Sequence, residues 1–210
     1  MRVLLWRSAQ SYLSGKEPQR AVNVLDQFVK LDHDELRLAH AWYLMGEAYR
    51  DQKKGSQAYQ AYTKCIEFPK TPFASKARYQ IALNEIAKNT PAGLDAARAI
   101  LLQNVSTHPP LDTKSYEDSH FKLGWVYFVQ KEYDDACRIY KRMPSQFPNH
   151  PEANNARYNL ANIYRLLSDR ISEKQIALLN ESRDNLTEDW KSQLEVQLEH
   201  FRQGKIEWLK

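Results

Sequence analysis

The sequence predicts an all-α protein, a solenoid of about five helix pairs followed by one further helix at the C-terminus. Three observations lead to this prediction: the composition favours long helices, a small-residue pattern recurs, and a longer motif repeats. The 210 residues are 42% hydrophobic and include only six glycines and nine prolines. Such a chain can bury a core, and few of its residues are of the two types that interrupt helices.

A small residue recurs in the middle of an apolar helical stripe, and we call it the central small residue. In residues 41–66, Gly46 follows Trp42 and Met45, and Ala58 stands twelve residues after Gly46. Successive central small residues are 37, 36, 42 and 37 positions apart, a period that indicates helical repeats. They are Ala9, Gly46, Ala82, Gly124 and Ala161.

A longer motif strengthens the repeat prediction. Residues 68–82 read FPKTPFASKARYQIA, and residues 147–161, which lie 79 positions later, read FPNHPEANNARYNLA. Both contain Phe-Pro, a second Pro, an Ala, and then Ala-Arg-Tyr-x-apolar-Ala. The separation corresponds to two repeats, so chance is a poor explanation.

We interpret the central small residues as the points where the two helix backbones of a pair come closest. A larger side chain there would overpack the contact, at a cost of about 1–3 kcal/mol. That cost exceeds the ~1 kcal/mol that glycine loses in a helix. Tyr62 and Tyr140, one turn after Ala58 and Ala136, are expected to fill the space beside the crossing.

These residues resemble the tetratricopeptide repeat, whose signature is Trp-x2-Leu-Gly-x2-Tyr, then Ala, an aromatic residue and Pro. The resemblance covers about residues 2–180, and it implies a right-handed superhelical solenoid with a concave groove. Arg78 and Arg157 depart from it at the Trp place, and Glu85 departs from it at the Tyr place. The matching residues are Trp42, Met45, Gly46, Tyr49, Ala58 and Tyr62 in the second unit and Leu123, Gly124, Tyr127, Ala136, Tyr140 and Pro148 in the fourth.

We expect a single solenoid over residues 1–210. Thr90-Pro91 and Ser172 with Gln175 are predicted helix starts, and longer inter-helix turns are predicted at 88–95 and 167–172. The predicted repeats are 2–36, 39–72, 75–108, 117–150 and 154–184, and the predicted capping helix is 187–210.

Both ends of the solenoid carry a prediction. The segment 187–210 has an apolar stripe and charges on its other face, as a terminal cap requires. No N-cap residue precedes the first unit at Arg2, from which we expect the chain to be a fragment of a longer protein. The stripe consists of Trp190, Leu194, Leu198 and Phe201.

The resemblance implies that the first helices of the pairs line the groove. Positions three before, one after and four after the central small residue share one side of each first helix. The middle of this stripe is apolar, with polar residues in the second and fifth units. The candidate partner-binding residues are Tyr43, Glu47, Arg50, Tyr79, Leu83, Ile86, Phe121, Trp125, Phe128, Tyr158, Asn162 and Arg165.

An alternative remains open for the aromatic residues three before the central small residue. They are also expected if neighbouring first helices simply pack on one another there. The groove centre has a further alternative, in which other parts of the protein or a second copy cover it. Those aromatic residues are Trp6, Tyr43, Tyr79, Phe121 and Tyr158.

Several classes of function are disfavoured. The six histidines lack metal-ligand spacing, no glycine-rich phosphate loop is present, and no Cys–His or Ser–His arrangement emerges, so we predict no enzyme, no metal and no cofactor. The net charge of +4 includes no basic run, which disfavours nucleic acid. No apolar stretch approaches a membrane span. Cys65 and Cys137 are predicted to be buried free thiols.

The sequence therefore predicts a non-enzymatic scaffold that binds a protein or peptide, in the form of an extended segment or a partner helix, in an aromatic-lined groove. The alternatives are a structural or self-assembly module and a regulatory arm of a larger protein. The Pro-x-x-x-x-Ala-Arg-Tyr joints are similar in style to those of bacterial envelope repeat proteins. That likeness favours a bacterial source and the periplasm or cell envelope over the cytoplasm.

Overall fold

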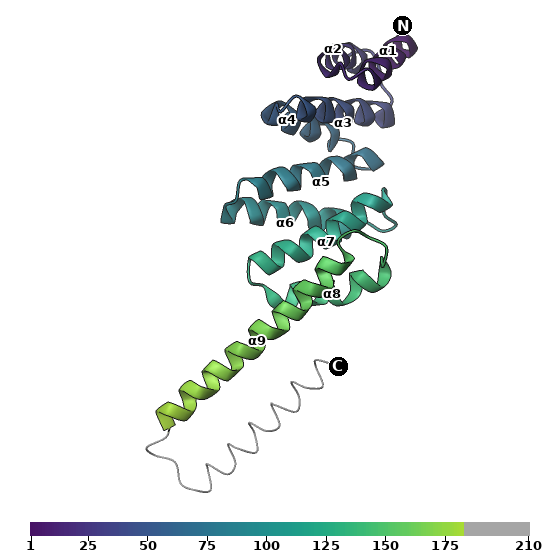
Figure 1. Cartoon of the computed structure of the whole chain (residues 1–210). Helices are drawn as coiled ribbons and strands as arrows, with labels where there is room; N and C mark the ends of the chain where they lie inside the picture. The colour runs from purple at the N-terminus through teal and green to yellow at the C-terminus, as the bar shows by residue number, and fades with distance from the viewer. Residues whose placement is uncertain (183–210) are drawn as a thin grey trace. The chain divides into compact units, whose positions relative to one another are not determined.

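The computed structural model describes residues 1–182, including the side chains of residues 1–170. These residues belong to two units, Met1–Arg157 (unit 1) and a second that begins at Tyr158 (unit 2), and each is treated separately. Unit 1 consists of four antiparallel helix pairs and the start of α9 (Figure 1). The helices are α1 (Arg2–Ser14), α2 (Pro18–Val29), α3 (Glu35–Asp51), α4 (Gly55–Cys65), α5 (Pro72–Ala87), α6 (Pro91–Val105), α7 (Thr113–Val129), α8 (Tyr133–Gln146) and α9 (Ala153–Ser182).

The pairs of unit 1 stack one on the next. Each helix from α1 to α7 packs against the one that follows it in the chain, and α5 also contacts both α3 and α7. The first helices α3, α5 and α7 therefore form one continuous layer. The predicted all-α solenoid of helix pairs is confirmed.

Two glycines make room for a tyrosine ring rather than for a backbone. A Cβ atom on Gly46 would lie 2.4 Å from Cε1 of Tyr62, and one on Gly124 would lie 2.7 Å from Cε1 of Tyr140. Both tyrosines are buried and come from the second helix of the same pair. The predicted notch is present, but the atoms nearest to it belong to the ring and not to the facing helix backbone.

The other two pairs fill the same space with a different combination. Ala9 packs in one core cluster with Leu25, and Ala82 packs in another with Leu101. Each leucine occupies the place of the tyrosine, four residues after an alanine of the second helix. The first and third pairs thus combine alanine with leucine, whereas the second and fourth combine glycine with tyrosine.

Each first helix of unit 1 ends in a residue with left-handed backbone geometry. It lies seven positions after the central small residue and has φ of 56° at Lys16, 58° at Lys53, 51° at Asn89 and 62° at Lys131. At three of the turns the next N–H reaches back five residues, as from Lys54 to the carbonyl oxygen of Tyr49 at 2.9 Å. These are Schellman motifs, in which glycine is the usual left-handed residue.

Short polar side chains supply four N-caps, three of them in the joints between pairs and one, Thr90, in the turn within the third pair. The side chains of Asp34, Thr71, Thr90 and Asp112 each accept a hydrogen bond from a backbone N–H in the first turn of the next helix. The predicted start at Thr90-Pro91 is therefore confirmed, whereas the longer turn predicted at 88–95 is wrong, because α6 already begins at Pro91. These caps fix where each helix begins and hence the register of the layer.

The prediction for the fifth pair is wrong at its turn. α9 runs without interruption from Ala153 to Ser182, so residues 167–172 are helical and Ser172 is no helix start. That segment lacks both glycine and proline, as does the real turn at 130–132, so its composition carries no signal for a turn. The capping helix 187–210 lies outside the described residues, and the single solenoid over 1–210 and the fragment origin stay predictions.

The volume match between Gly46 and Tyr62 gives a stability prediction. Gly46→Ala should lower the free energy of unfolding by about 1–3 kcal/mol, because the ring is held by other contacts and cannot retreat. Combining it with Tyr62→Leu recreates the combination of the first and third pairs. Urea unfolding measures the decrease in the free energy of unfolding for each variant. The decrease for the double variant should be smaller, by at least about 1 kcal/mol, than the sum of the decreases for the two single variants. Strict additivity would contradict the match.

The left-handed turns give a second stability prediction. Lys53→Gly should raise the free energy of unfolding by about 1 kcal/mol, because glycine adopts positive φ without the Cβ clash. Lys54→Gly is the matched control, since Lys54 has φ of −94° and should not gain. Equal effects of the two substitutions on the urea midpoint would refute the strain argument.

Candidate partner-binding surface

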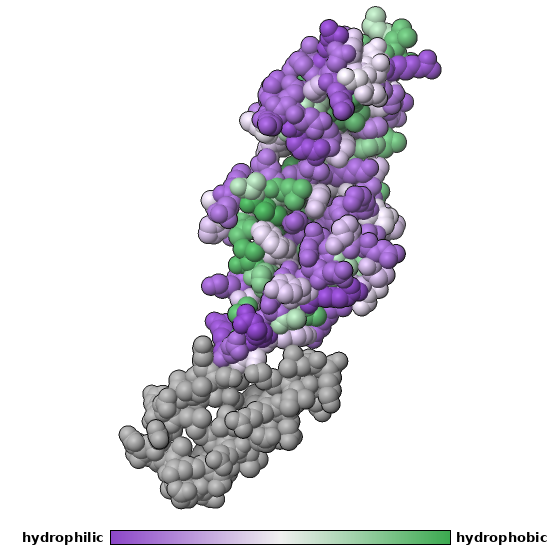
Figure 2. Space-filling view, viewed as in Figure 1, coloured by the Kyte–Doolittle hydropathy of each residue, from purple (hydrophilic) through white to green (hydrophobic). Residues whose placement is uncertain are grey.

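The layer of first helices carries a central apolar surface, which we define as Leu83 and Ile86 of α5 and Trp125 and Phe128 of α7. All four side chains are partly exposed. Ile86 and Trp125 rest on the buried core of the third and fourth pairs, which holds them in place. Figure 2 shows apolar side chains gathered where α5, α6 and α7 lie in Figure 1, between two more polar regions.

The aromatic residues three before the central small residue mainly join neighbouring repeats. The ring centroids of Trp6 and His40 are 5.0 Å apart, and those of Tyr43 and Phe73 are 6.1 Å apart. Phe121 stacks on His150 at 4.2 Å and is only 3% exposed. This favours the packing alternative for the row, and it leaves Phe121 almost no surface that a partner can touch.

The polar edge in the second repeat is held by a fixed network. Glu47 accepts a hydrogen bond from the Tyr62 hydroxyl at 2.5 Å, and its two carboxylate oxygens lie 2.9 and 2.8 Å from Nη1 and Nη2 of Arg50. Arg50 also donates to Gln80 of α5 at 3.3 Å. Glu47 and Arg50 thus neutralise each other and tie α3 to both α4 and α5.

Two tyrosines supply hydroxyl groups beside the apolar surface. Burial, together with the nearby Glu47 carboxylate, raises the pKa of Tyr43 to about 12. Burial, together with Asp118 and Glu152, raises the pKa of Tyr79 to about 12. Both phenols therefore stay neutral at physiological pH and keep a proton to donate.

Sequence reasoning missed a fourth row of the same stripe, six positions before the central small residue. It consists of Val3, His40, Lys76 and Asp118. The signal was available, because positions six and three before it lie on one side of a helix.

The side chains of this fourth row are engaged in contacts between repeats. The ring of His40 stacks on Phe73 at 4.0 Å. Lys76 lies 3.6 Å from an Asp112 carboxylate oxygen, and Asp118 lies 2.9 Å from Nε2 of His150. The members of this row on α3, α5 and α7 are therefore polar and already in contact with other side chains of unit 1, whereas Val3 of α1 is apolar and exposed.

Three candidate residues belong to unit 2 and are described by themselves. Tyr158 of α9 is largely exposed, Asn162 is partly exposed, and Arg165 is exposed with its guanidinium 3.5 Å from Asp169. The other nine candidates lie on α3, α5 and α7 of unit 1.

Chemistry beyond binding has little support in the part of the chain that the structure describes. Within it, no group of three His, Cys, Asp or Glu side chains is placed to hold a metal ion, and no helix is long and apolar enough to cross a membrane. Burial raises the pKa of the Cys65 thiol to about 12, and it also raises that of the partly buried Cys137. Both are free, and neither has the thiolate character of a nucleophile.

The comparisons with known proteins agree with this geometry. Residues 4–32 and 118–150 match one family model of the tetratricopeptide repeat, and residues 39–71 match another. Such repeats are generally protein–protein interaction modules and are typically non-catalytic. No curated protein matches the chain.

Solved structures share the fold. The crystal structure of MamA protein has 18% sequence identity and a TM-score of 0.61, covering 89% of this chain and 96% of that chain. Two crystal structures of nearly identical TPR-like repeats of a putative kinesin light chain from Podosopora anserina, one of them a point variant, have TM-scores of 0.53. Their identities are 18% and 16%, and they cover 84% and 85% of this chain and 90% and 94% of those chains. At such identities the likeness concerns the fold alone.

Partly buried His40 makes the free energy of unfolding depend on pH. Burial, with a smaller effect of Lys76, lowers the pKa of His40 below its ordinary 6.5. As the pH falls through about 6.5, the His40 imidazole takes up a proton in the unfolded state but stays neutral in the folded state. The free energy of unfolding therefore decreases. Urea unfolding at pH 7.5 and 5.5 should show a smaller difference for His40→Gln than for the wild type.

The exposed His33 provides the control for this experiment. His33→Gln should keep the full difference between the two pH values. Burial also lowers the pKa of His120, so a residual difference in His40→Gln is expected. A difference left unchanged by His40→Gln would contradict the assignment.

Proposed function

We propose that this tetratricopeptide-repeat protein is a non-enzymatic scaffold that binds a peptide segment or a partner helix on the layer formed by α3, α5 and α7. The observation that carries the proposal is the central apolar surface, which stays partly exposed although core residues lie directly beneath it. An amphipathic helix or an extended segment that buries two or three apolar side chains there would gain most of its binding energy from them.

The surroundings of this surface favour a specific mode of contact. Glu47 and Arg50 are already paired with each other. They therefore form a polar border that can stay in contact with water when the partner binds. The hydroxyl of Tyr79 is a donor for a carbonyl oxygen of the partner. We therefore assign the apolar surface to affinity and the polar edge to orientation, and we expect only weak dependence on salt.

The candidate residues divide into roles under this proposal. Leu83, Ile86, Trp125 and Phe128 contact the partner, whereas Tyr43, Glu47 and Arg50 form the edge. Tyr79 donates its hydroxyl to the partner, and Phe121, which is almost fully buried against His150, holds α7 in place. Tyr158, Asn162 and Arg165 of unit 2 remain candidates for a further contact.

Self-association is the second candidate, because the same exposed apolar side chains would equally accept a neighbouring copy. The neighbouring Val129 at the end of α7 is also exposed and would enlarge such a contact. Sedimentation of the isolated chain separates the two cases. If the chain is a monomer at all concentrations, the self-association hypothesis is rejected. If it forms a dimer that Phe128→Asp dissociates, self-association takes the place of peptide binding as the proposed function.

Substitution of Phe128 tests the proposal. The probes are a synthetic amphipathic helix with leucines three and four residues apart and the same peptide carrying a central proline, and calorimetry measures their binding. Phe128→Asp should weaken the preferred probe at least about tenfold, because an apolar contact cannot hydrate the new carboxylate. Leu102→Asp on α6 makes the same chemical change at an exposed site and should leave affinity unchanged.

The comparison of the two probes also identifies the mode of binding. Preference for the uninterrupted peptide indicates a helical partner, and preference for the proline peptide indicates an extended one. A monomeric wild type that binds neither probe, or equal affinities of Phe128→Asp and the wild type, would remove the apolar surface from the proposal.

A further inference from the structure

Unit 1 has a cavity of about 220 Å³ at its N-terminal end, between α1 and the joint of α2 with α3, outside the central apolar surface. We propose that it binds a small apolar group that bears a carboxylate. The inference is independent of the proposed partner-binding surface. The lining residues are Arg2, Val3, Trp6, Phe28, Asp32 and Arg37.

The walls of the cavity set the size and polarity of the ligand. Trp6 and Phe28 form an aromatic corner with ring centroids 5.1 Å apart, and Val3 adds an aliphatic side. An apolar cavity of about 150 Å³ holds a benzene ring, so this one accepts a single ring with a short chain. It is smaller than the ~300–1,000 Å³ pockets that hold drug-sized molecules.

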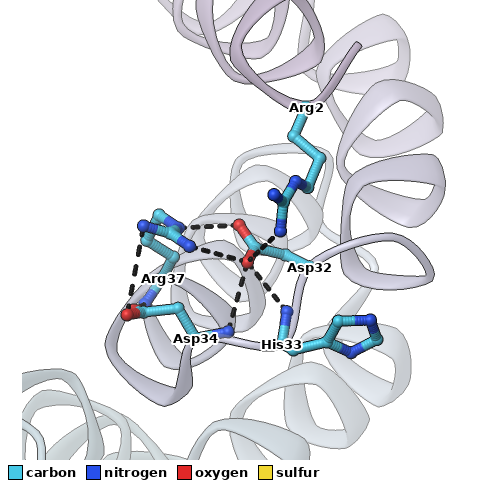
Figure 3. Close-up of polar contacts among 5 residues, drawn as sticks. All are labelled: Arg2, Asp32, His33, Asp34 and Arg37. Carbon is cyan, nitrogen blue, oxygen red and sulfur yellow. Dashed lines mark hydrogen bonds and ion pairs between the residues drawn. The ribbon is translucent and has the colours of Figure 1, made fainter.

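Asp32 cannot serve as the ligand-binding acceptor, although it is a carboxylate in the cavity. Its Oδ1 accepts hydrogen bonds from the backbone N–H groups of His33 at 2.8 Å and Asp34 at 3.1 Å and from Nη2 of Arg37 at 2.9 Å (Figure 3). Its Oδ2 accepts one from Nε of Arg37 at 2.7 Å. These bonds leave Asp32 little capacity for a cationic or amine ligand.

The arginines determine the sign of the charge that the cavity accepts. The two lining guanidinium groups face the carboxylate of Asp32, and Arg37 also lies 3.9 Å from a carboxylate oxygen of Asp34, so Arg2 is the cation with the weaker pairing. Arg37 is committed to Asp32, but Nη1 of Arg2 is 3.6 Å from Oδ1 of Asp32, longer than a hydrogen bond. About half of the Arg2 side chain is exposed, so its donors can turn to a ligand carboxylate.

Binding of 3-phenylpropionate by the full-length chain tests the proposal, with the neutral 3-phenylpropanamide as the matched ligand. The readout is the indole N–H signal of Trp6 in NMR spectra, assigned with Trp6→Phe. The acid should bind about tenfold more tightly than the amide, because only the acid gains a charge-assisted hydrogen bond. Arg2→Gln should abolish this preference, and Arg7→Gln, an exposed arginine on the same helix, should retain it.

Two further arms distinguish the source of the carboxylate. A short peptide ending in phenylalanine is compared with its C-terminally amidated form. Tighter binding of the free peptide than of 3-phenylpropionate identifies a chain terminus, and equal or weaker binding identifies a small acid; both support the site. Equal binding of acid and amide, an unchanged preference in Arg2→Gln, or a response of tryptophans other than Trp6 would overturn it.

Discussion

The structure of unit 1 depends on a match of volumes inside each helix pair. A glycine on the first helix faces a tyrosine on the second in two pairs, and an alanine is combined with a leucine in the other two. The sum of the two volumes stays similar, so the two helices keep a similar separation from pair to pair. Equal separation lets α3, α5 and α7 form one layer, which aligns the stripe residues of successive repeats. The candidate binding surface is therefore a consequence of this match.

Much of the fold was predictable because it follows from local spacing. The central small residues of unit 1 and the helix start at Pro91 are visible in the sequence, and the third pair forms although Glu85 departs from the repeat signature. The failure at 167–172 has a physical reason. The real turns depend on a left-handed residue that is lysine three times and asparagine once, and lysine carries no compositional signal for a turn.

The candidate site was predictable as a stripe but not as an exposed surface. Helical spacing places Phe121 and Trp125 on one side of α7. It does not reveal that His150 covers the first, because His150 comes from the joint that follows α8. Phe73 likewise reaches Tyr43 from the first turn of α5, directly after a joint. Side chains in and beside the joints decide which stripe residues stay accessible, and a repeat signature does not include them.

Because the main contacts of unit 1 join helices that are consecutive in the chain or neighbours in the layer, distant repeats are not braced against each other by extensive contacts within that unit. In such an array, small rotations at successive joints add up. Bending of the whole array therefore requires less energy than other deformations. A partner that spans α5 and α7 would stiffen the joint between them. A force that bends unit 1 at this joint would then lower the affinity for the partner. The fraction of protein with bound partner would therefore depend on mechanical force.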